Sequence, residues 1–187
     1  HTVGENSVFG GDQLYQKTEL SFQKRFSLED YGFLDLVADY QKVWTKAPFP
    51  MLLYPDANRG YIVDNKSFYL VNAMDFINDE QYSIRLAYFA DNLLFARIPI
   101  LDALGFRELF ILRGFHGSLS NRNIPIKENG LFVFPANTAS MGNTPYIEGA
   151  VGITNILGLL RVEYVHRLTY RDHPNAINFG FRLDVTF

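Results

Sequence analysis

Hydrophobic and polar residues alternate without interruption at the end of the chain. From Asn178 to Phe187 every second residue is apolar, and the residues between are polar or glycine. A period of two over this length predicts a β-strand, whose side chains point to opposite faces in turn. The apolar face comprises Phe179, Phe181, Leu183, Val185 and Phe187, and the opposite face includes Arg182 and Asp184.

The preceding segment repeats this pattern. Its apolar positions share one face with His166, and its charged positions share the other face with Thr169 and Val165. The stretch R-D-H-P-N-A between the two segments is rich in turn-forming residues, which predicts a β-hairpin. The apolar face carries Leu160, Val162, Tyr164, Leu168 and Tyr170, and the charged face carries Arg161, Glu163, Arg167 and Arg171.

Similar alternation earlier in the chain predicts further strands. A weaker strand is expected at 68–76, where Asn72 interrupts the apolar face. Together with the hairpin this gives roughly eight strands in antiparallel succession. The other expected strands lie within 19–28, 34–41, 82–88 and 147–153, and at 106–112, where the pattern does not show which face is apolar.

Alternation alone fits two environments. In a soluble antiparallel sheet the apolar face is buried and the charged face is in water. In a transmembrane barrel the apolar side chains face lipid and the charged ones line the lumen. Large aromatic residues at strand ends and strands of about ten residues favour the barrel. We therefore predict an all-β fold, an antiparallel up-and-down transmembrane β-barrel, in a single domain spanning 1–187.

The lengths of the connections predict an orientation. If the last strand, 178–187, ends at the periplasm, 154–158 is a short periplasmic turn and about 117–144 is a long extracellular loop. The segment 45–66 falls on the periplasmic side although it is long. Either the strand count is wrong there, or this segment packs inside the lumen.

Composition narrows the possible classes. A hydrophobic fraction of 48% is too high for a disordered chain, and the absence of cysteine excludes disulfides and thiolate zinc sites. A formal net charge of −3 argues against a nucleic-acid partner. The longest apolar stretch, Ala47 to Pro55, is much shorter than the roughly 20 residues of a membrane-spanning helix.

The sequence predicts no catalytic site, no metal site and no cofactor. Ser118 and Ser120 lie near His116, but a G-x-S-x-G turn and a third group are missing. The charged strand faces are expected to fill and order a polar lumen, because residues of opposite sign alternate within cross-strand reach. A cationic wall that attracts anions is the alternative. The chain has four histidines, His1, His116, His166 and His173. No two of them have a metal-ligand spacing on one strand face.

Longer stretches resemble a family of Bacteroidetes outer-membrane proteins of unknown function, whose longer members begin with a carboxypeptidase-regulatory-like domain. The resemblance covers nearly the whole chain, and its last two stretches also match in order and spacing. The matching stretches are K-R-F-S-L at 24–28, P-F-P and L-Y-P-D-A-N within 48–58, S-F-Y-L-V-N-A-M-D-F at 67–76, F-A-R-I-P-I-L at 95–101, F-P-A-N and M-G-N-T-P-Y-I-E within 134–148, and L-R-V-E-Y-V-H-R-L-T-Y-R-D-H-P at 160–174.

This resemblance implies a non-enzymatic β-barrel in the cell outer membrane, of which the chain is the C-terminal part. Phe187 resembles the terminal aromatic residue that the barrel-insertion machinery recognises. The implied partners are outer-membrane lipid, that machinery, and the remaining barrel strands or other subunits of a membrane complex. The barrel would be a membrane anchor or a component of a transport or assembly complex. The alternative is a soluble eight-stranded barrel that binds a small apolar ligand.

A shorter motif, Arg113-Gly114-Phe115, resembles the R-G-F/Y motif of outer-membrane assembly and translocation barrels. In those proteins the arginine reaches into the lumen. Here we expect the tripeptide to follow a strand and to open the extracellular loop. Only two clear strands follow the loop's return strand, fewer than that fold requires.

Overall fold

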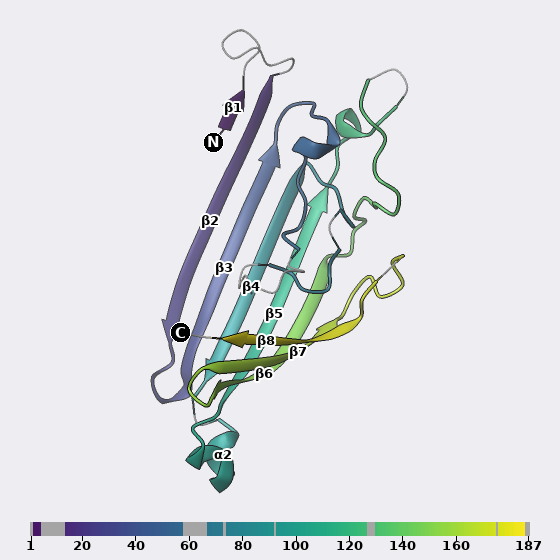
Figure 1. The fold of residues 1–187 in the computed structure, drawn as a ribbon. Helices are drawn as coiled ribbons and strands as arrows, with labels where there is room; N and C mark the ends of the chain where they lie inside the picture. Colours follow the sequence, from purple (N-terminus) through teal and green to yellow (C-terminus); the bar gives the residue numbers. More distant parts are fainter. Residues whose placement is uncertain are drawn as a thin grey trace.

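The computed structural model describes residues 2–4, 14–57, 67–72, 74–91, 93–126, 130–174 and 176–185. Its strands form one eight-stranded sheet in which each strand pairs with the next along the chain (Figure 1). All these pairs are antiparallel, so the predicted all-β, up-and-down arrangement is confirmed. The strands are β1 (Thr2–Gly4), β2 (Tyr15–Ser27), β3 (Gly32–Val43), β4 (Glu80–Ala90), β5 (Arg107–Ser118), β6 (Tyr146–Ile156), β7 (Leu160–Arg167) and β8 (Phe179–Val185).

Helical segments are short and lie in the connections. None of the described helices is long and apolar enough to cross a membrane. The only α-helix among the described residues is α2 (Pro99–Ala103), in the connection between β4 and β5. The 3-10 turns are η1 (Glu29–Tyr31), η2 (Phe49–Met51), η3 (Phe95–Arg97) and η4 (Asn121–Asn123).

The seven long strands, β2 to β8, occur where the alternation predicts them. The strand expected at 68–76 is wrong. The backbone N–H of Asn72 donates to the Asp75 carboxylate at 2.9 Å, and the Asp75 N–H donates to the Asn72 carbonyl at 3.2 Å. Met74 within this turn has a φ of 64°. A local turn therefore replaces the strand, because Asn and Asp side chains compete with sheet pairing for backbone groups.

The loss of that strand changes the assignment of the long connections. Residues 44–79 form one connection, at the same end of the sheet as the connection between β5 and β6 and the one between β7 and β8 (Figure 1). The prediction that 45–66 lies at the same end as 154–158 is therefore wrong, because it depended on a strand that does not form. The opposite end carries the connections 28–31, 91–106 and 157–159.

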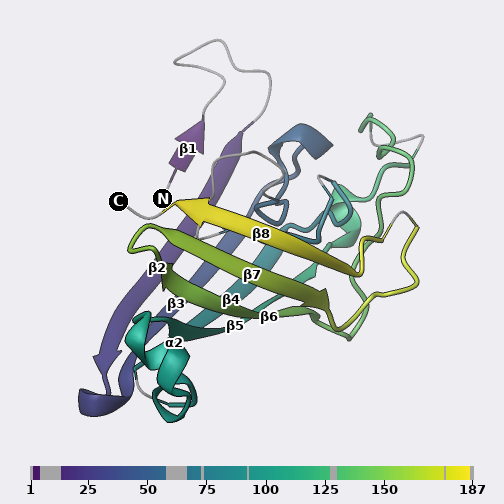
Figure 2. The ribbon, with the colours of Figure 1, turned by 60° about the horizontal axis from the view of Figure 1, so that its bottom comes forward.

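The sheet is strongly staggered and curls on itself. Figure 2 shows β6, β7 and β8 crossing in front of β2, β3 and β4. A line of directly paired residues begins near the end of β2 and reaches the first residue of β8, running through Lys24, Leu36, Leu86, Leu112, Gly149, His166 and Phe179. Such a slope of strands against the sheet axis is typical of a barrel wall. In the described part of the chain, however, β1 and β8 do not pair, so the sheet is not closed.

The described parts of the connection 44–79 are packed rather than extended into solvent. Leu52, Leu53 and Ile77 form a buried cluster with Val43 at the end of β3. Phe68 and Phe76 form a second buried cluster with aromatic residues of β5 and β6. Burial raises the pKa of the Tyr54 hydroxyl, whose ring packs against the first cluster. These contacts place the connection against one face of the sheet, which is named the inner face below.

Candidate functional site

The outer face of the sheet exposes large apolar side chains. On β8, Phe181 is 77% exposed and Leu183 is 61% exposed. Large apolar side chains on β2, β4, β5, β6 and β7 are also exposed, including Phe22 on β2 and Ile84 on β4. The remaining exposed apolar residues on strands include Leu20, Phe26, Tyr82, Leu112, Val151, Val162, Tyr164, Phe179 and Val185.

The inner face buries charged side chains at the alternate positions. Arg113 on β5 is 2% exposed, while Glu148 on β6 and Arg167 on β7 are fully buried. Arg85, Arg161 and Glu163 are buried as well. Apolar residues such as Leu109, Phe115 and Tyr146 are buried on this face too. The sheet nevertheless differs from a water-soluble one, because arginine and glutamate are inside while large apolar side chains are exposed on the other face.

The strand register brings opposite charges together on the inner face. Glu148 is directly opposite Arg113 on one side and Arg167 on the other. The Arg113 Nη1 lies 3.5 Å from Glu148 Oε1.

Glu163 is likewise opposite Arg182 on β8, with Nη1 and Oε2 3.9 Å apart, and it also binds Arg161 two residues away. Because a buried ion without a partner is strongly unfavourable, this pairing explains how so many charges are accommodated.

A dipeptide of the long connection lies against these charges. Both backbone N–H groups of Tyr69 and Leu70 donate to the Glu148 carboxylate, at 3.0 and 3.2 Å to the nearer oxygens. The Arg167 Nη1 donates to the Leu70 carbonyl at 3.2 Å. Glu148 on β6 and Arg167 on β7 thus contact the backbone of the dipeptide. Arg113 on β5 and Arg182 on β8 contact the Tyr69 ring.

The Tyr69 ring lies between two guanidinium groups. Arg113 lies 4.2 Å and Arg182 3.9 Å from the ring centroid. Both distances fall within the range of a cation–π interaction, which strengthens as water is removed. Tyr69 is therefore fixed by its ring and by its backbone at once, and these contacts are called the Tyr69 site below.

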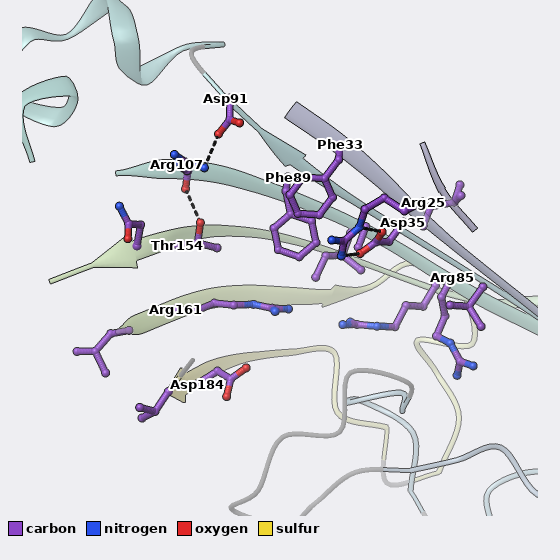
Figure 3. A pocket seen from close by; sticks show the side chains of 18 of the residues that line it. Arg25, Phe33, Asp35, Arg85, Phe89, Asp91, Arg107, Thr154, Arg161 and Asp184 are labelled. Carbon is purple, nitrogen blue, oxygen red and sulfur yellow. Dashed lines mark hydrogen bonds and ion pairs between the residues drawn. The ribbon is translucent and has the colours of Figure 1, made fainter. Parts of the chain in front are cut away.

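A hollow of about 900 Å³ shares Arg113 with the Tyr69 site and extends to residues of the connections 91–106 and 157–159. Figure 3 shows part of its lining. Its lining includes Arg25 from β2 and Asp184 from β8, so the first and last long strands both border it. Figure 3 shows Arg161 and Asp184 on one side of it and Arg25 with Asp35 on the other. Five arginines and three aspartates are among its described lining residues: Arg25, Arg85, Arg107, Arg113, Arg161, Asp35, Asp91 and Asp184.

Acidic partners neutralise several of these arginines. The Arg25 guanidinium binds both Asp35 carboxylate oxygens at 2.6 and 2.7 Å, and Arg107 lies 2.9 Å from Asp91. The Arg85 Nη2 lies 2.5 Å from Asp39. The positive and negative groups are interleaved, so the inner face resembles a balanced polar wall more than a site for one anion.

Most residues expected to share a strand face do so. Leu160 is half-buried, whereas Val162, Tyr164, Leu168, Phe179, Phe181, Leu183 and Val185 are exposed. The residues expected on the opposite face, Arg161, Glu163, Arg167, Arg182 and Asp184, are buried or half-buried. Phe187 lies outside the described residues.

Two assignments at the end of β7 are wrong. The strand ends at Arg167, and Tyr170 has a φ of 53°, which interrupts the alternation. The Tyr170 ring packs against the buried ring of Phe76, with centroids 5.0 Å apart, instead of sharing the outer face. Arg171 is exposed in the connection rather than on the inner face.

Sequence reasoning found some inner-face residues and misplaced others. Arg85 and Glu148 alternate with apolar neighbours, which predicts them on the polar face, and both are buried on the inner face. The tripeptide Arg113–Phe115 does not open the loop, because β5 continues to Ser118 and places Arg113 inside the strand. The packing of Tyr69 against β6 joins residues 79 positions apart, and alternation carries no information on such contacts.

The candidate chemical residues do not assemble. Among the described residues there is no group of three His, Asp or Glu side chains that could bind a metal. The Ser120 hydroxyl donates to Asp79 and not to a histidine. His166 lies 3.3 Å from the Tyr164 hydroxyl, and His173 packs near Phe76. His1 lies outside the described residues.

Comparison with protein-family models, with curated proteins and with solved structures finds no match to this chain.

Proposed function

We propose that this chain is the wall of an outer-membrane β-barrel, with its outer face in lipid and its inner face around a polar lumen. One observation carries the proposal. Along β5 to β8, arginine and glutamate are buried on the inner face, while phenylalanine, leucine and valine are exposed on the outer face. Lipid is the environment in which an exposed band of such apolar side chains is stable.

Further strands complete the barrel in this proposal. β2 pairs with β3 as far as Ser27 but with β1 only through Tyr15–Lys17. No described strand pairs with the rest of that β2 edge, or with the outer edge of β8. Unpaired backbone groups in lipid cost several kcal/mol each, so the edges require partners. These are the remaining strands of the same protein or strands of another subunit of a membrane complex.

The proposal agrees with the resemblance to the Bacteroidetes outer-membrane family. It gives the chain an anchoring or transport role in the outer membrane, after delivery by the barrel-insertion machinery, and no catalytic role. A soluble barrel that binds an apolar ligand would need an apolar interior. The arginines and aspartates that line the hollow do not favour it, and we do not propose it.

The test is the migration of the protein on a detergent gel with and without boiling, after extraction from the outer-membrane fraction. A folded transmembrane barrel resists the detergent and migrates differently until it is boiled. We expect this heat-dependent shift in the membrane fraction. A protein that remains in solution as a monomer without detergent would contradict the proposal.

A further inference from the structure

The two halves of the inner face differ in how they are filled. Toward the long connections, Phe68, Phe76, Phe115 and Tyr146 pack into a dense aromatic cluster. Toward the short connections lies the hollow, bordered by all seven long strands. The Tyr69 site lies between these halves, because Arg113 borders the hollow and also contacts the Tyr69 ring.

We propose that the inner side conducts small hydrophilic solutes and that the Tyr69–Leu70 dipeptide is the gate of this pathway. This inference rests on the proposed membrane barrel. The hollow is the vestibule on the side of the short connections. Tyr69 blocks the pathway behind Arg113, which lines the hollow and contacts the Tyr69 ring. Glu148 and Arg167 keep the dipeptide in the closed position.

The contacts of the dipeptide are of a kind that water can replace. Glu148 accepts two backbone N–H groups, and Arg167 donates to one backbone carbonyl. The aromatic contact of Tyr69 is with guanidinium groups, which water also solvates well. Opening would thus exchange polar contacts for hydration beside a hollow that is lined in part by charged groups.

Buried donors beside the dipeptide also favour hydration. Arg113 Nε and Arg167 Nη2 are buried without a hydrogen-bond partner among the described residues. Water that enters along the pathway can accept hydrogen bonds from these two groups.

Apolar contacts oppose opening and keep the gate closed most of the time. The Leu70 side chain packs in a cluster with Leu109, Ile111 and Val165. Leu52, Leu53 and Ile77 of the same connection pack in a buried cluster with Val43. Movement is thus confined to the dipeptide and its neighbours, as expected for a gate on a fixed support.

The experiment measures ion current through the purified, membrane-inserted protein in planar lipid bilayers. We expect the wild type to show a low open fraction. Tyr69→Ala removes the ring from between the two guanidinium groups, and Glu148→Ala removes the acceptor for both N–H groups. Each should raise the open fraction at least tenfold. Met74→Asn, at an exposed position of the same connection with a φ of 64° that asparagine tolerates, is the matched control and should conduct like the wild type.

A cross-link gives a second, independent measurement. A β-carbon at Gly180 would lie 3.5 Å from the Leu70 side chain, and the sequence contains no cysteine. A Leu70→Cys, Gly180→Cys variant treated with a short thiol cross-linker should lose the remaining openings. The same variant without the reagent should retain them.

These measurements distinguish a failure of the proposed gate from a failure of the proposed membrane barrel. If the variants show the heat-dependent gel shift but Tyr69→Ala conducts like the wild type, or the cross-linked protein opens as before, the gate is wrong and the barrel stands. If the wild type shows no heat-dependent shift and does not enter membranes, the barrel is wrong and the gate falls with it.

Discussion

Adjacent residues of this chain are in opposite environments, and β8 shows this most directly. Leu183 is 61% exposed on the outer face, whereas Asp184 borders the polar hollow on the inner face. In water, replacing an exposed leucine by arginine changes stability by less than about 0.5 kcal/mol. In lipid the same change places a charge against hydrocarbon.

Leu183→Arg should therefore separate a lipid-facing residue from a water-facing one. Near the middle of the membrane we expect a loss of about 2–4 kcal/mol in the free energy of unfolding. The fraction of protein with the heat-dependent gel shift should fall accordingly. Asp184→Asn on the neighbouring position is the control and should keep most of that fraction. Equal behaviour of the two variants would show that the outer face is not in lipid.

Individual elements could be predicted from alternation wherever a strand is long and has two different faces. Six of the seven long strands satisfy this condition. β5 was expected as a strand at 106–112, but the apolar residues there occupy both faces, so alternation did not show which face is buried. β1 has only three residues and carries no readable period. The segment 68–76 has apolar residues at alternate positions, but the turn between Asn72 and Asp75 directs them into clusters instead. Local polar contacts of this kind override a hydrophobic period.

The hairpin between β2 and β3 depends on one glycine. Gly32, the first residue of β3, has a φ of 95° and a ψ of −141°, a conformation that is essentially restricted to glycine. A β-carbon there would lie 2.0 Å from the carbonyl oxygen of Phe89 on β4. We expect Gly32→Ala to destabilise the protein by at least about 2 kcal/mol, because both the backbone conformation and the contact oppose it.

The midpoint of urea unfolding in detergent measures this loss. Gly142→Ala is the matched control, since nothing lies within 4 Å of the added carbon. It should leave the midpoint nearly unchanged. Similar midpoints for the two variants would mean that the β2–β3 connection does not have this geometry.

At the scale of the whole molecule, the inner face could be predicted only in part. The charged face of the last hairpin was evident from Arg161, Glu163 and Arg182. The Tyr69 site was not, because it depends on how a long connection folds back over the sheet. Alternation identifies which face a strand residue occupies, but only the tertiary structure shows which distant segment covers that face.

The connections at the two ends of the sheet differ, and this difference predicts how the protein is oriented across the membrane. The two longest connections between the described strands, 44–79 and 119–145, lie at the same end of the sheet, as the long extracellular loops of outer-membrane barrels do. Val133 in the connection between β5 and β6 and Ile100 in α2 are exposed by 83% and 72%, at opposite ends. We therefore expect Val133 outside the cell and Ile100 in the periplasm.

Single-cysteine labelling tests this direction without background, because the sequence contains no cysteine. A membrane-impermeant maleimide should label Val133→Cys on intact cells. Ile100→Cys should react only after the outer membrane is permeabilised, although both side chains are well exposed. The reverse pattern would invert the barrel in the membrane, and equal labelling of both variants on intact cells would show that the chain does not separate two compartments.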